Sequence, residues 1–180
     1  CGSVGTLGCG LWPSIEHTGM TTPDSIELQR QLAVIKSKGA THLAMEVSSH
    51  ALALGRVDQT EIDIAVFTQL SRDHLDFHRD MSEYEQVKMS LFRRGDLSMA
   101  VVNADDATGL KIIEEVAGRI PVIGISMATN HQSEIPMVVI NDLVKTRGGF
   151  NVELLTPWGR GWVDVPLLGT CNLYNVMSLV

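Results

Sequence analysis

Phe67-Thr-Gln-Leu-Ser-Arg-Asp-His-Leu-Asp-Phe-His78 is the stretch that decides the fold. It begins inside an apolar run, residues 62–68, whose β-branched and aromatic side chains predict a buried strand. Residues 71–79 then form a polar segment dense in Asp and His, which predicts a loop. The strand therefore ends where side chains able to bind a ligand begin.

A helix is predicted directly after this loop. Asp80-Met-Ser-Glu83 has the spacing of an N-cap residue and of the residue that reaches back to it. The inward face of the helix is predicted from its spacing to carry Tyr84, Val87, Lys88, Leu91 and Phe92. Lys88 is thus expected to point inward, where a cation is costly unless it is paired or chemically modified. The alternative is a lysine whose stem lies along the core and whose amine reaches the surface.

Length and composition describe one ordinary globular domain. The 180 residues are 44% hydrophobic and 19% charged, and no apolar run approaches the length of a membrane span. The net charge of -7 argues against a nucleic-acid surface. Cys1, Cys9 and Cys171 lack metal-ligand spacing, which favours reduced thiols in a cytoplasmic protein. Neither a membrane nor a nucleic acid is expected as a partner.

The segment before residue 62 predicts a strand, a helix and a second strand. Residues 4–11 are glycine-rich and predict a strand or a hairpin. The helix is expected to start with Thr22 as its N-cap. Residues 41–47 predict a strand that delivers Glu46 near its C-terminal end. A parallel crossover would bring the ends of the strands 41–47 and 62–68 to one edge of one sheet, where open α/β sheets bind ligands.

The predicted pattern of strands and helices changes after residue 127. The earlier part, about residues 1–127, is predicted to be a mostly parallel sheet flanked by helices, so the fold class is α/β. Residues 137–168 predict a small antiparallel β-meander. Residues 169–180 predict the start of a truncated helix, and the whole of 1–180 is expected to be one truncated domain.

Three motifs closely resemble the central domain of the Mur ligases, and within them the MurE type, the UDP-N-acetylmuramoyl-tripeptide synthetases. They are Glu46-Val-Ser-Ser-His50, Thr68-Gln-Leu-Ser-Arg-Asp-His-Leu-Asp-Phe-His78 and Glu83-Tyr-Glu-Gln-Val-Lys88. The chain contains no G-x-x-x-x-G-K-[ST], the phosphate-binding loop that precedes this region in the family. The resemblance therefore implies a central ATPase-like domain without its first strand and P-loop, separated from the family's N- and C-terminal domains and inactive by itself.

The resemblance also implies a magnesium site. Lys88 matches a lysine that CO₂ carbamylates in the family, and Glu46, His74 and the modified Lys88 match ligands of magnesium, with two ions expected in total. Hard oxygen ligands suit Mg²⁺, and a carbamate supplies them. His is an unusual partner for Mg²⁺, so the alternative for His74 is a histidine that caps its loop. Lys88 and His74 are the expected catalytic residues.

Substrate and nucleotide contacts follow from the same resemblance. Thr21, Thr22, Ser48 and Arg56 match residues that contact the UDP-muramoyl-dipeptide, with helix capping as the alternative for Thr22 and a surface salt bridge as the alternative for Arg56. The residues that match the nucleotide-binding positions are Asn103, Asn172 and Asn175. Asp105 or Asp106 is also a natural N-cap for the next helix. His78 and His131 are taken as solvated histidines and are left unassigned.

The reaction that the resemblance implies is ATP-dependent amide formation in peptidoglycan synthesis. The parent protein would take UDP-N-acetylmuramoyl-L-alanyl-D-glutamate, ATP and an amino acid, with meso-diaminopimelate favoured over lysine. Another Mur ligase or a folylpolyglutamate synthetase is the alternative within the superfamily. A non-catalytic metal- or nucleotide-binding module is the alternative outside it, because the phosphate-binding loop is absent from the sequence.

Overall fold

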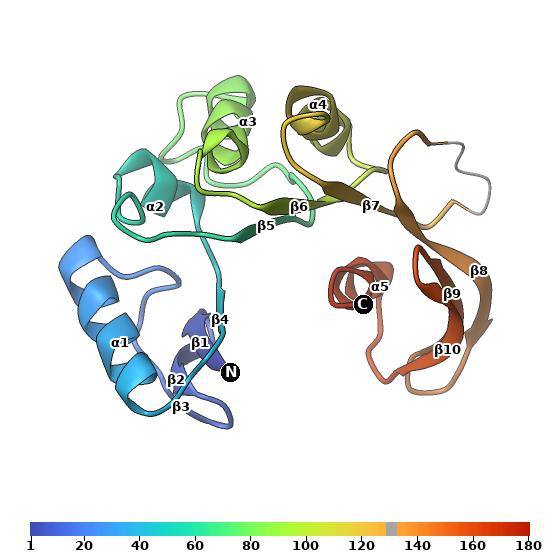
Figure 1. Cartoon of the computed structure of the whole chain (residues 1–180), viewed down its shortest axis with the longest axis horizontal. Helices are drawn as coiled ribbons and strands as arrows, with labels where there is room; N and C mark the ends of the chain where they lie inside the picture. Colours follow the sequence, from blue (N-terminus) through green and yellow to red (C-terminus); the bar gives the residue numbers. More distant parts are fainter. Residues whose placement is uncertain (129–132) are drawn as a thin grey trace. The chain divides into compact units, whose positions relative to one another are not determined.

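The computed structural model describes residues 1–128 and 133–180 and divides into two compact units (Figure 1). Unit 1 comprises Cys1–Glu61 and His74–Leu91, and unit 2 comprises Ile62–Asp73 and Phe92–Val180. Each unit has its own sheet and its own hydrophobic core. The assignment of the whole chain to one domain stays a prediction. His131 lies outside the described residues.

The sheet of unit 1 has the strand order β3-β2-β1-β4. Its antiparallel strands are β1 (Gly2–Gly5), β2 (Gly8–Leu11) and β3 (Ser14–Glu16), so the prediction of a glycine-rich hairpin is confirmed. β4 (Leu43–Met45) runs parallel to β1. Glycine lets α1 approach β1 closely, because a Cβ on Gly2 would lie 2.4 Å from the Ile35 side chain.

The helices of unit 1 are α1 (Ser25–Ser37), α2 (Ser49–Ala53) and α3 (Met81–Ser90). The N-cap of α1 is Asp24, whose carboxylate accepts from the two amides of Ile26 and Glu27. The prediction that Thr22 caps this helix is therefore wrong. Asp24 directly precedes the first turn, whereas the Thr22 hydroxyl is engaged by the backbone that follows β4. The core of unit 1 contains Val4, Cys9, Leu28, Ile35 and Val57.

The sheet of unit 2 has the order β10-β9-β8-β7-β6-β5. Its parallel part is β5 (Ile64–Phe67), β6 (Met99–Asn103), β7 (Val122–Ser126) and β8 (Met137–Lys145). The antiparallel part adds β9 (Phe150–Thr156) and β10 (Gly159–Val165). The predicted α/β fold class, a mostly parallel sheet with an antiparallel meander, is confirmed, and β8 joins the two parts.

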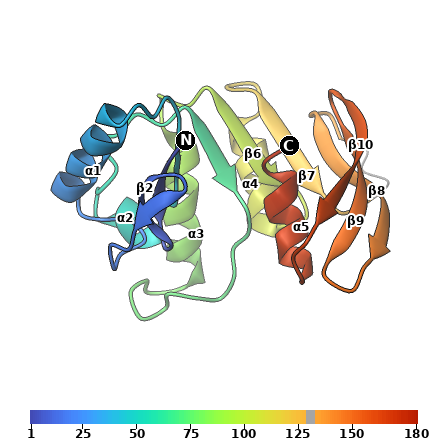
Figure 2. The same ribbon diagram turned by 90° about the horizontal axis from the view of Figure 1, so that it is seen from below.

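Two helices cover opposite faces of the unit 2 sheet. α4 (Ala107–Val116) packs on β6 and β7, and α5 (Thr170–Met177) lies on the other face against β7 and β10 (Figures 1 and 2). A short 3₁₀ helix, η1 (Leu91–Arg93), follows α3. Within residues 1–128 and 133–180, no helix combines the length and the apolar character that a membrane span requires.

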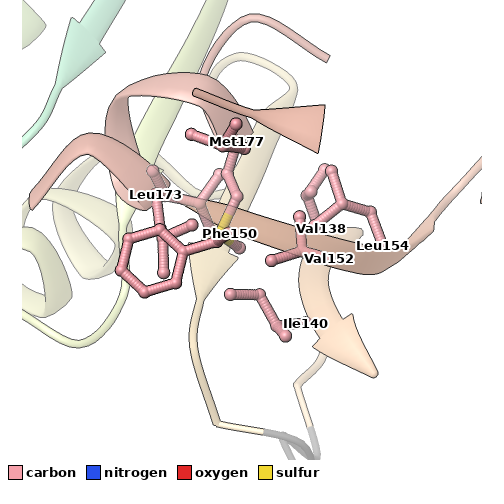
Figure 3. Packing of buried hydrophobic residues seen from close by; sticks show 9 residues of the cluster. Val138, Ile140, Phe150, Val152, Leu154, Leu173 and Met177 are labelled. Atoms are coloured by element: carbon pink, nitrogen blue, oxygen red, sulfur yellow. The ribbon is translucent and has the colours of Figure 1, made fainter. Parts of the chain in front are cut away.

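A hydrophobic cluster of unit 2 lies between the strands of its sheet and α5 (Figure 3). Leu173 and Met177, one turn apart on α5, are 1% and 2% exposed, so the helix is held by its apolar face. Strand residues of the sheet complete the cluster: Ile125, Val138, Ile140, Phe150, Val152, Leu154 and Val165.

One predicted pairing is wrong. The strands 41–47 and 62–68 were expected at one edge of one sheet, but β4 pairs with β1 and β5 pairs with β6. An apolar run identifies a strand without identifying its hydrogen-bonded neighbour. The glycine-rich β1, whose strand character is weak in the sequence, is the neighbour that β4 takes.

Candidate functional site

Glu46 directly follows β4 and is held by the hairpin of β1 and β2. Its backbone N–H donates to the carbonyl of Val4 at 2.9 Å, which continues the parallel pairing by one residue. Its carboxylate accepts from the backbone N–H of Thr6 at 3.2 Å and from the Thr6 hydroxyl at 2.9 Å. The end of β4 therefore presents an exposed carboxylate in a defined orientation.

Thr22 links the predicted substrate residues. It is 1% exposed, and its hydroxyl donates to the carbonyl of Glu46 at 2.7 Å and accepts from the N–H of Ser48 at 3.1 Å. Its own carbonyl accepts from the guanidinium of Arg56 at 2.9 Å, so Arg56 contacts this loop. Thr21 reaches the same group through its hydroxyl, which lies 3.0 Å from that of Thr6. The structure brings Thr21, Thr22, Ser48 and Arg56 together beside Glu46.

The start of α3 fixes the position of Lys88. The carboxylate of Asp80 accepts from the N–H of Glu83 at 2.8 Å, and the Glu83 carboxylate accepts from the N–H of Arg79 at 2.7 Å. The predicted cap is confirmed, with Glu83 reaching one residue beyond the N-cap. The hydrogen bond from Glu83 is the main reason why the pKa of Asp80 lies below its usual range.

Lys88 turns toward the interior of unit 1. Its side chain is half-buried, and its amine donates a long hydrogen bond of 3.4 Å to the carbonyl of Val47, the residue after Glu46. Burial lowers the pKa of this amine, because the charged form is poorly solvated there. A lowered pKa increases the fraction of neutral amine, which is the form that reacts with CO₂.

His74 occupies an unusual backbone conformation. Its φ is 56°, a left-handed region that few residues other than glycine adopt, and its carbonyl accepts from the N–H of His78 at 2.9 Å. Its ring lies edge-on to Tyr84, one turn before Lys88 on α3, with centroids 5.9 Å apart. It is also edge-on to His50 at 5.1 Å. His74 and Lys88 thus lie in one unit, near the same turn of α3.

His78 was expected to be solvated, and that expectation is wrong. It is 2% exposed, its Nε2 lies 2.8 Å from the Ser49 hydroxyl, and its ring stacks on Tyr84. Nearby His50 has its pKa lowered, first by burial and then by His74 and His78. His78 therefore joins the His74 loop to α2 and α3, which sequence spacing did not indicate.

The side chains of this site would suit a hard cation such as Mg²⁺ only if Lys88 were carbamylated. Among the described residues, no three His, Cys, Asp or Glu side chains gather as a metal-binding group. Glu46 and His74 supply one carboxylate and one imidazole, and Mg²⁺ prefers oxygen ligands together with substrate phosphates. A carbamate on Lys88 would supply the missing anionic oxygens, and the lowered pKa of its amine favours that reaction.

The residues predicted for the nucleotide lie in unit 2. Asn103, at the end of β6, is 4% exposed; its amide donates to the carbonyl of Thr68 at 2.7 Å and accepts from the N–H of Asp105 at 2.9 Å. Asn103 thus joins the ends of β5 and β6. Asp106 is the N-cap of α4, as one of the two alternatives predicted.

Asp105 connects this loop to α5. Its carboxylate accepts from the Ser126 hydroxyl at 2.6 Å, the Met127 N–H at 2.7 Å and the Tyr174 hydroxyl at 2.8 Å. Burial and this hydrogen bond raise the pKa of Tyr174 to about 12. Asn172 and Asn175, on either side of Tyr174, are held on α5 by a contact of 3.4 Å between their amides.

The predicted residues divide between the two units. All residues assigned to magnesium and to the UDP-muramoyl-dipeptide fall in unit 1, and the three assigned to the nucleotide fall in unit 2. The sequence interpretation missed Thr6, Gly5 and His78. The only signal for the first two was the glycine-rich hairpin, because the partner of Thr6 lies 40 residues away.

The whole chain, residues 1–180, matches the family model described as the Mur ligase middle domain. The UDP-N-acetylmuramoyl-L-alanyl-D-glutamate--2,6-diaminopimelate ligase of Coxiella burnetii is 43% identical over 180 residues, which are 100% of this chain and 37% of that ligase. The ligase of the same name from Alkalilimnicola ehrlichii is 41% identical over 179 residues, 99% of this chain and 35% of that protein. The chain spans 35% to 37% of the length of these curated relatives.

Solved structures agree with the fold. The structure of a UDP-N-acetylmuramoyl-L-alanyl-D-glutamate--2,6-diaminopimelate ligase has a TM-score of 0.87 and 34% identity, covering 99% of this chain and 36% of that one. MurF from Acinetobacter baumannii has a TM-score of 0.64 at 19% identity, covering 87% of this chain and 34% of that one. The second likeness concerns the fold alone.

Proposed function

Because the chain belongs to the Mur ligase family, whose middle domain it matches along its whole length, we propose that it forms the central domain of a peptidoglycan ligase. The parent protein would use ATP to join diaminopimelate to UDP-N-acetylmuramoyl-L-alanyl-D-glutamate. The names of relatives 43% and 41% identical to this chain support this substrate choice. Its three free cysteines support a reducing compartment, the cytoplasm.

The single observation that carries the proposal is the environment of Lys88. Its half-buried amine has a lowered pKa and lies against the carbonyl next to Glu46. The neutral amine would attack CO₂, forming an N–C bond and releasing one proton, so that a cation becomes an anion. A carbamate anion at this point would bind a metal cation, which an unmodified lysine cannot do.

Glu46, His74 and the carbamylated Lys88 would hold magnesium, with two ions in the working site. Bound magnesium supplies positive charge that neutralises the phosphates of ATP. Glu46 reaches its position because Thr6 and the parallel pairing of β4 fix both its side chain and its backbone. His74 is fixed by its tight turn.

The threonine loop would bind the UDP-muramoyl-dipeptide. Thr22 is buried and is already bonded to Ser48 and Arg56, so it would order the loop, while the half-buried neighbour Thr21 and the Arg56 guanidinium would contact the substrate. Correct placement of the substrate carboxylate near the γ-phosphate would supply a large part of the rate enhancement. Asn103 would shape the nucleotide site from the ends of β5 and β6, and Asn172 and Asn175 would present amides to the adenine edge.

The reaction would proceed in two displacements. The terminal carboxylate of the dipeptide forms a bond to the γ-phosphorus, and the bond from phosphorus to ADP breaks, which gives an acyl phosphate. The amine of diaminopimelate then forms the amide bond and inorganic phosphate leaves with the former carboxylate oxygen. The protein's contribution is positioning and charge stabilisation.

The test uses the full-length protein that contains this chain. We expect phosphate release that requires the UDP-muramoyl-dipeptide and diaminopimelate together. Glu46→Gln and Lys88→Met are each expected to lower kcat by about 100-fold, because each removes a charged group at the phosphates. Thr41→Val, which lies before the N-terminal end of β4, is the matched control. With ¹³C-bicarbonate, a carbamate carbon signal is expected in the wild type and absent in Lys88→Met.

Three results would redirect the proposal. Amide formation with lysine but not with diaminopimelate would change the amino acid and keep the mechanism. Ligation of glutamate to a folate, with none to the UDP-muramoyl-dipeptide, would favour the folylpolyglutamate synthetases. Binding of Mg²⁺ and ADP without turnover of any of these substrates would favour a non-catalytic module.

A further inference from the structure

The hairpin of β1 and β2 holds the Glu46 carboxylate in a defined position, which we call its seat and which Gly5 and Thr6 form. Thr6 gives one hydrogen bond to each carboxylate oxygen, its N–H to Oε1 at 3.2 Å and its hydroxyl to Oε2 at 2.9 Å. Two donors from one residue fix the plane of the carboxylate as well as its position. A carboxylate held only by its own rotamer preferences would have no such restraint.

Gly5 completes this seat because it has no side chain. A Cβ at this position would lie 2.5 Å from Oε1 of Glu46, closer than two unbonded atoms can approach. The backbone of Gly5 is outside the left-handed region, so no turn requires glycine there. The space for the carboxylate is the physical reason for this glycine.

The Thr6 hydroxyl also connects Glu46 to Thr21. A hydroxyl has one hydrogen, and that of Thr6 is directed to Glu46, so Thr6 can only accept from Thr21, whose oxygen lies 3.0 Å away. The hydroxyl of Thr21 therefore donates inward and presents only its lone pairs outward. Thr21, Thr6 and Glu46 form a directed chain of hydrogen bonds that ends on the carboxylate.

We propose that Thr6 is a positioning residue that orients Glu46 for the cation and couples the seating of the substrate at Thr21 to that carboxylate. This inference rests on the proposed function, since it takes Glu46 as a magnesium ligand and Thr21 as a substrate contact. Coupling between two bound species is reciprocal, so substrate tightens cation binding to the same degree that the cation tightens substrate binding.

The test measures cation binding in the full-length protein with Mn²⁺ as the probe, followed by electron paramagnetic resonance. Thr6→Val keeps the shape of the side chain and removes the hydroxyl, and it is expected to weaken Mn²⁺ affinity by about 10-fold, the lower end of the effect of losing a residue that supports a metal ligand. Thr6→Ser keeps the hydroxyl and is expected to restore binding. Thr41→Val removes a hydroxyl beyond the other end of β4 and is expected to leave binding unchanged.

The coupling has its own readout. In the wild type, the UDP-muramoyl-dipeptide is expected to increase Mn²⁺ affinity, and Thr6→Val is expected to abolish that increase. Equal Mn²⁺ affinity in Thr6→Val and Thr6→Ser would overturn the positioning role. A substrate effect that persists in Thr6→Val would overturn the coupling. Thr6→Ala serves as the second variant if the valine variant does not fold, with the same expected loss.

Glu46→Gln separates this inference from the proposed function. If that variant binds Mn²⁺ as the wild type does, the proposed role of Glu46 fails and the inference fails with it. If Glu46→Gln loses binding while Thr6→Val retains it, the proposed function stands and only the role of Thr6 is overturned. Loss in both variants, with rescue by Thr6→Ser, is the result expected.

Discussion

Burial of the Lys88 amine lowers the stability of the fold. This amine is half-buried and its pKa is lowered by burial, which means that the charged form is less stable in the folded protein than in the unfolded chain. Replacing such a group by an apolar side chain of similar length often stabilises a protein. Under the proposed function, the lysine is kept for the carbamate that its amine would form, rather than for what it adds to the fold.

Lys88→Met is expected to raise the free energy of unfolding at pH 7 in buffers free of bicarbonate. The penalty on the wild-type amine is complete below the lowered folded pKa, and it disappears as the pH rises to the ordinary value of 10.5. The gain in the variant should thus shrink with rising pH. Urea unfolding followed by circular dichroism at several pH values measures this, with the exposed Lys36→Met as control. A variant less stable than the wild type at pH 7 would contradict the argument.

At the level of elements, the sequence predicted most helices and strands correctly, but it did not predict which strands pair with each other. The strand before the His-rich loop, the cap at Asp80 and the meander were predicted, and Asp106 was one of two caps predicted for α4, because each depends on residues close together in the chain. The cap of α1 was misassigned by two residues, since Thr22 and Asp24 are both good caps and only the tertiary bond from Thr22 to the Glu46 carbonyl decides between them. The pairing of β4 with β1 could not be predicted for the same reason.

For the site as well, some residues were predicted from the sequence and others were not. The sequence identified Thr21, Thr22, Ser48 and Arg56 through a resemblance. In the structure, Thr22 bonds to Ser48 and Arg56, and Thr21 lies beside Thr6. The sequence did not identify the supporting residues, because Thr6 reaches Glu46 across 40 positions. Support from distant residues leaves no periodic trace in a sequence.

The start of β5 is anchored by Asp96. Its carboxylate accepts from the N–H of Ile62 at 3.0 Å and pairs with the guanidinium of Arg94 at 2.6 Å, and the bond with Arg94 is the main reason why its pKa falls to about 2. Asp96→Asn is expected to lower the free energy of unfolding by about 1 kcal/mol at pH 7.

This contribution has a defined pH range. Because the folded pKa of Asp96 is depressed from 3.8 to about 2, its stabilisation is present above pH 3.8 and is lost as the pH falls toward 2. The difference between wild type and variant in denaturant titrations should close over that interval. Glu61→Gln, the loss of an exposed carboxylate nearby in sequence, is the control. A difference that is constant from pH 7 to pH 2 would exclude an ionic origin.

Tyr174 fastens α5 to the loop after β6. Tyr174→Phe removes one hydrogen bond to the Asp105 carboxylate and is expected to lower stability by about 1 kcal/mol. Hydrogen exchange of the α5 amides should become faster in this variant. Asp105→Asn also weakens the bonds from Ser126 and Met127 and should have the larger effect. Equal exchange in Tyr174→Phe and wild type would show that the apolar face alone holds the helix.

For the molecule as a whole, the proposed binding residues fall into two groups, one in each unit. Unit 1 contains the residues proposed for the cation and the UDP-muramoyl-dipeptide, and unit 2 contains those proposed for the nucleotide. Each unit contains a cluster of buried apolar side chains, and a large-to-small change in either cluster would leave a cavity there. The chain spans 35% to 37% of the length of its curated relatives, so the proposed turnover is tested on the full-length protein.

The 180-residue chain by itself is expected to release no phosphate from ATP, with or without the UDP-muramoyl-dipeptide. Its sequence has no G-x-x-x-x-G-K-[ST] to surround the β- and γ-phosphates. A coupled phosphate assay on the purified chain, with the full-length protein as the positive control, measures this. Substrate-dependent release by the chain alone would contradict the prediction.

The change of direction at β8 has a kinetic consequence. β8, β9 and β10 pair with strands next to them in the chain. β5 and β6 instead pair across the 31 residues that separate Phe67 from Met99, a segment that includes α3. Loop-closure entropy is smaller for the first kind of pairing, so it should form earlier during refolding. Pulsed hydrogen-exchange labelling should find the amides of β9 protected before those of β5, and the reverse order would show that refolding begins in the parallel part.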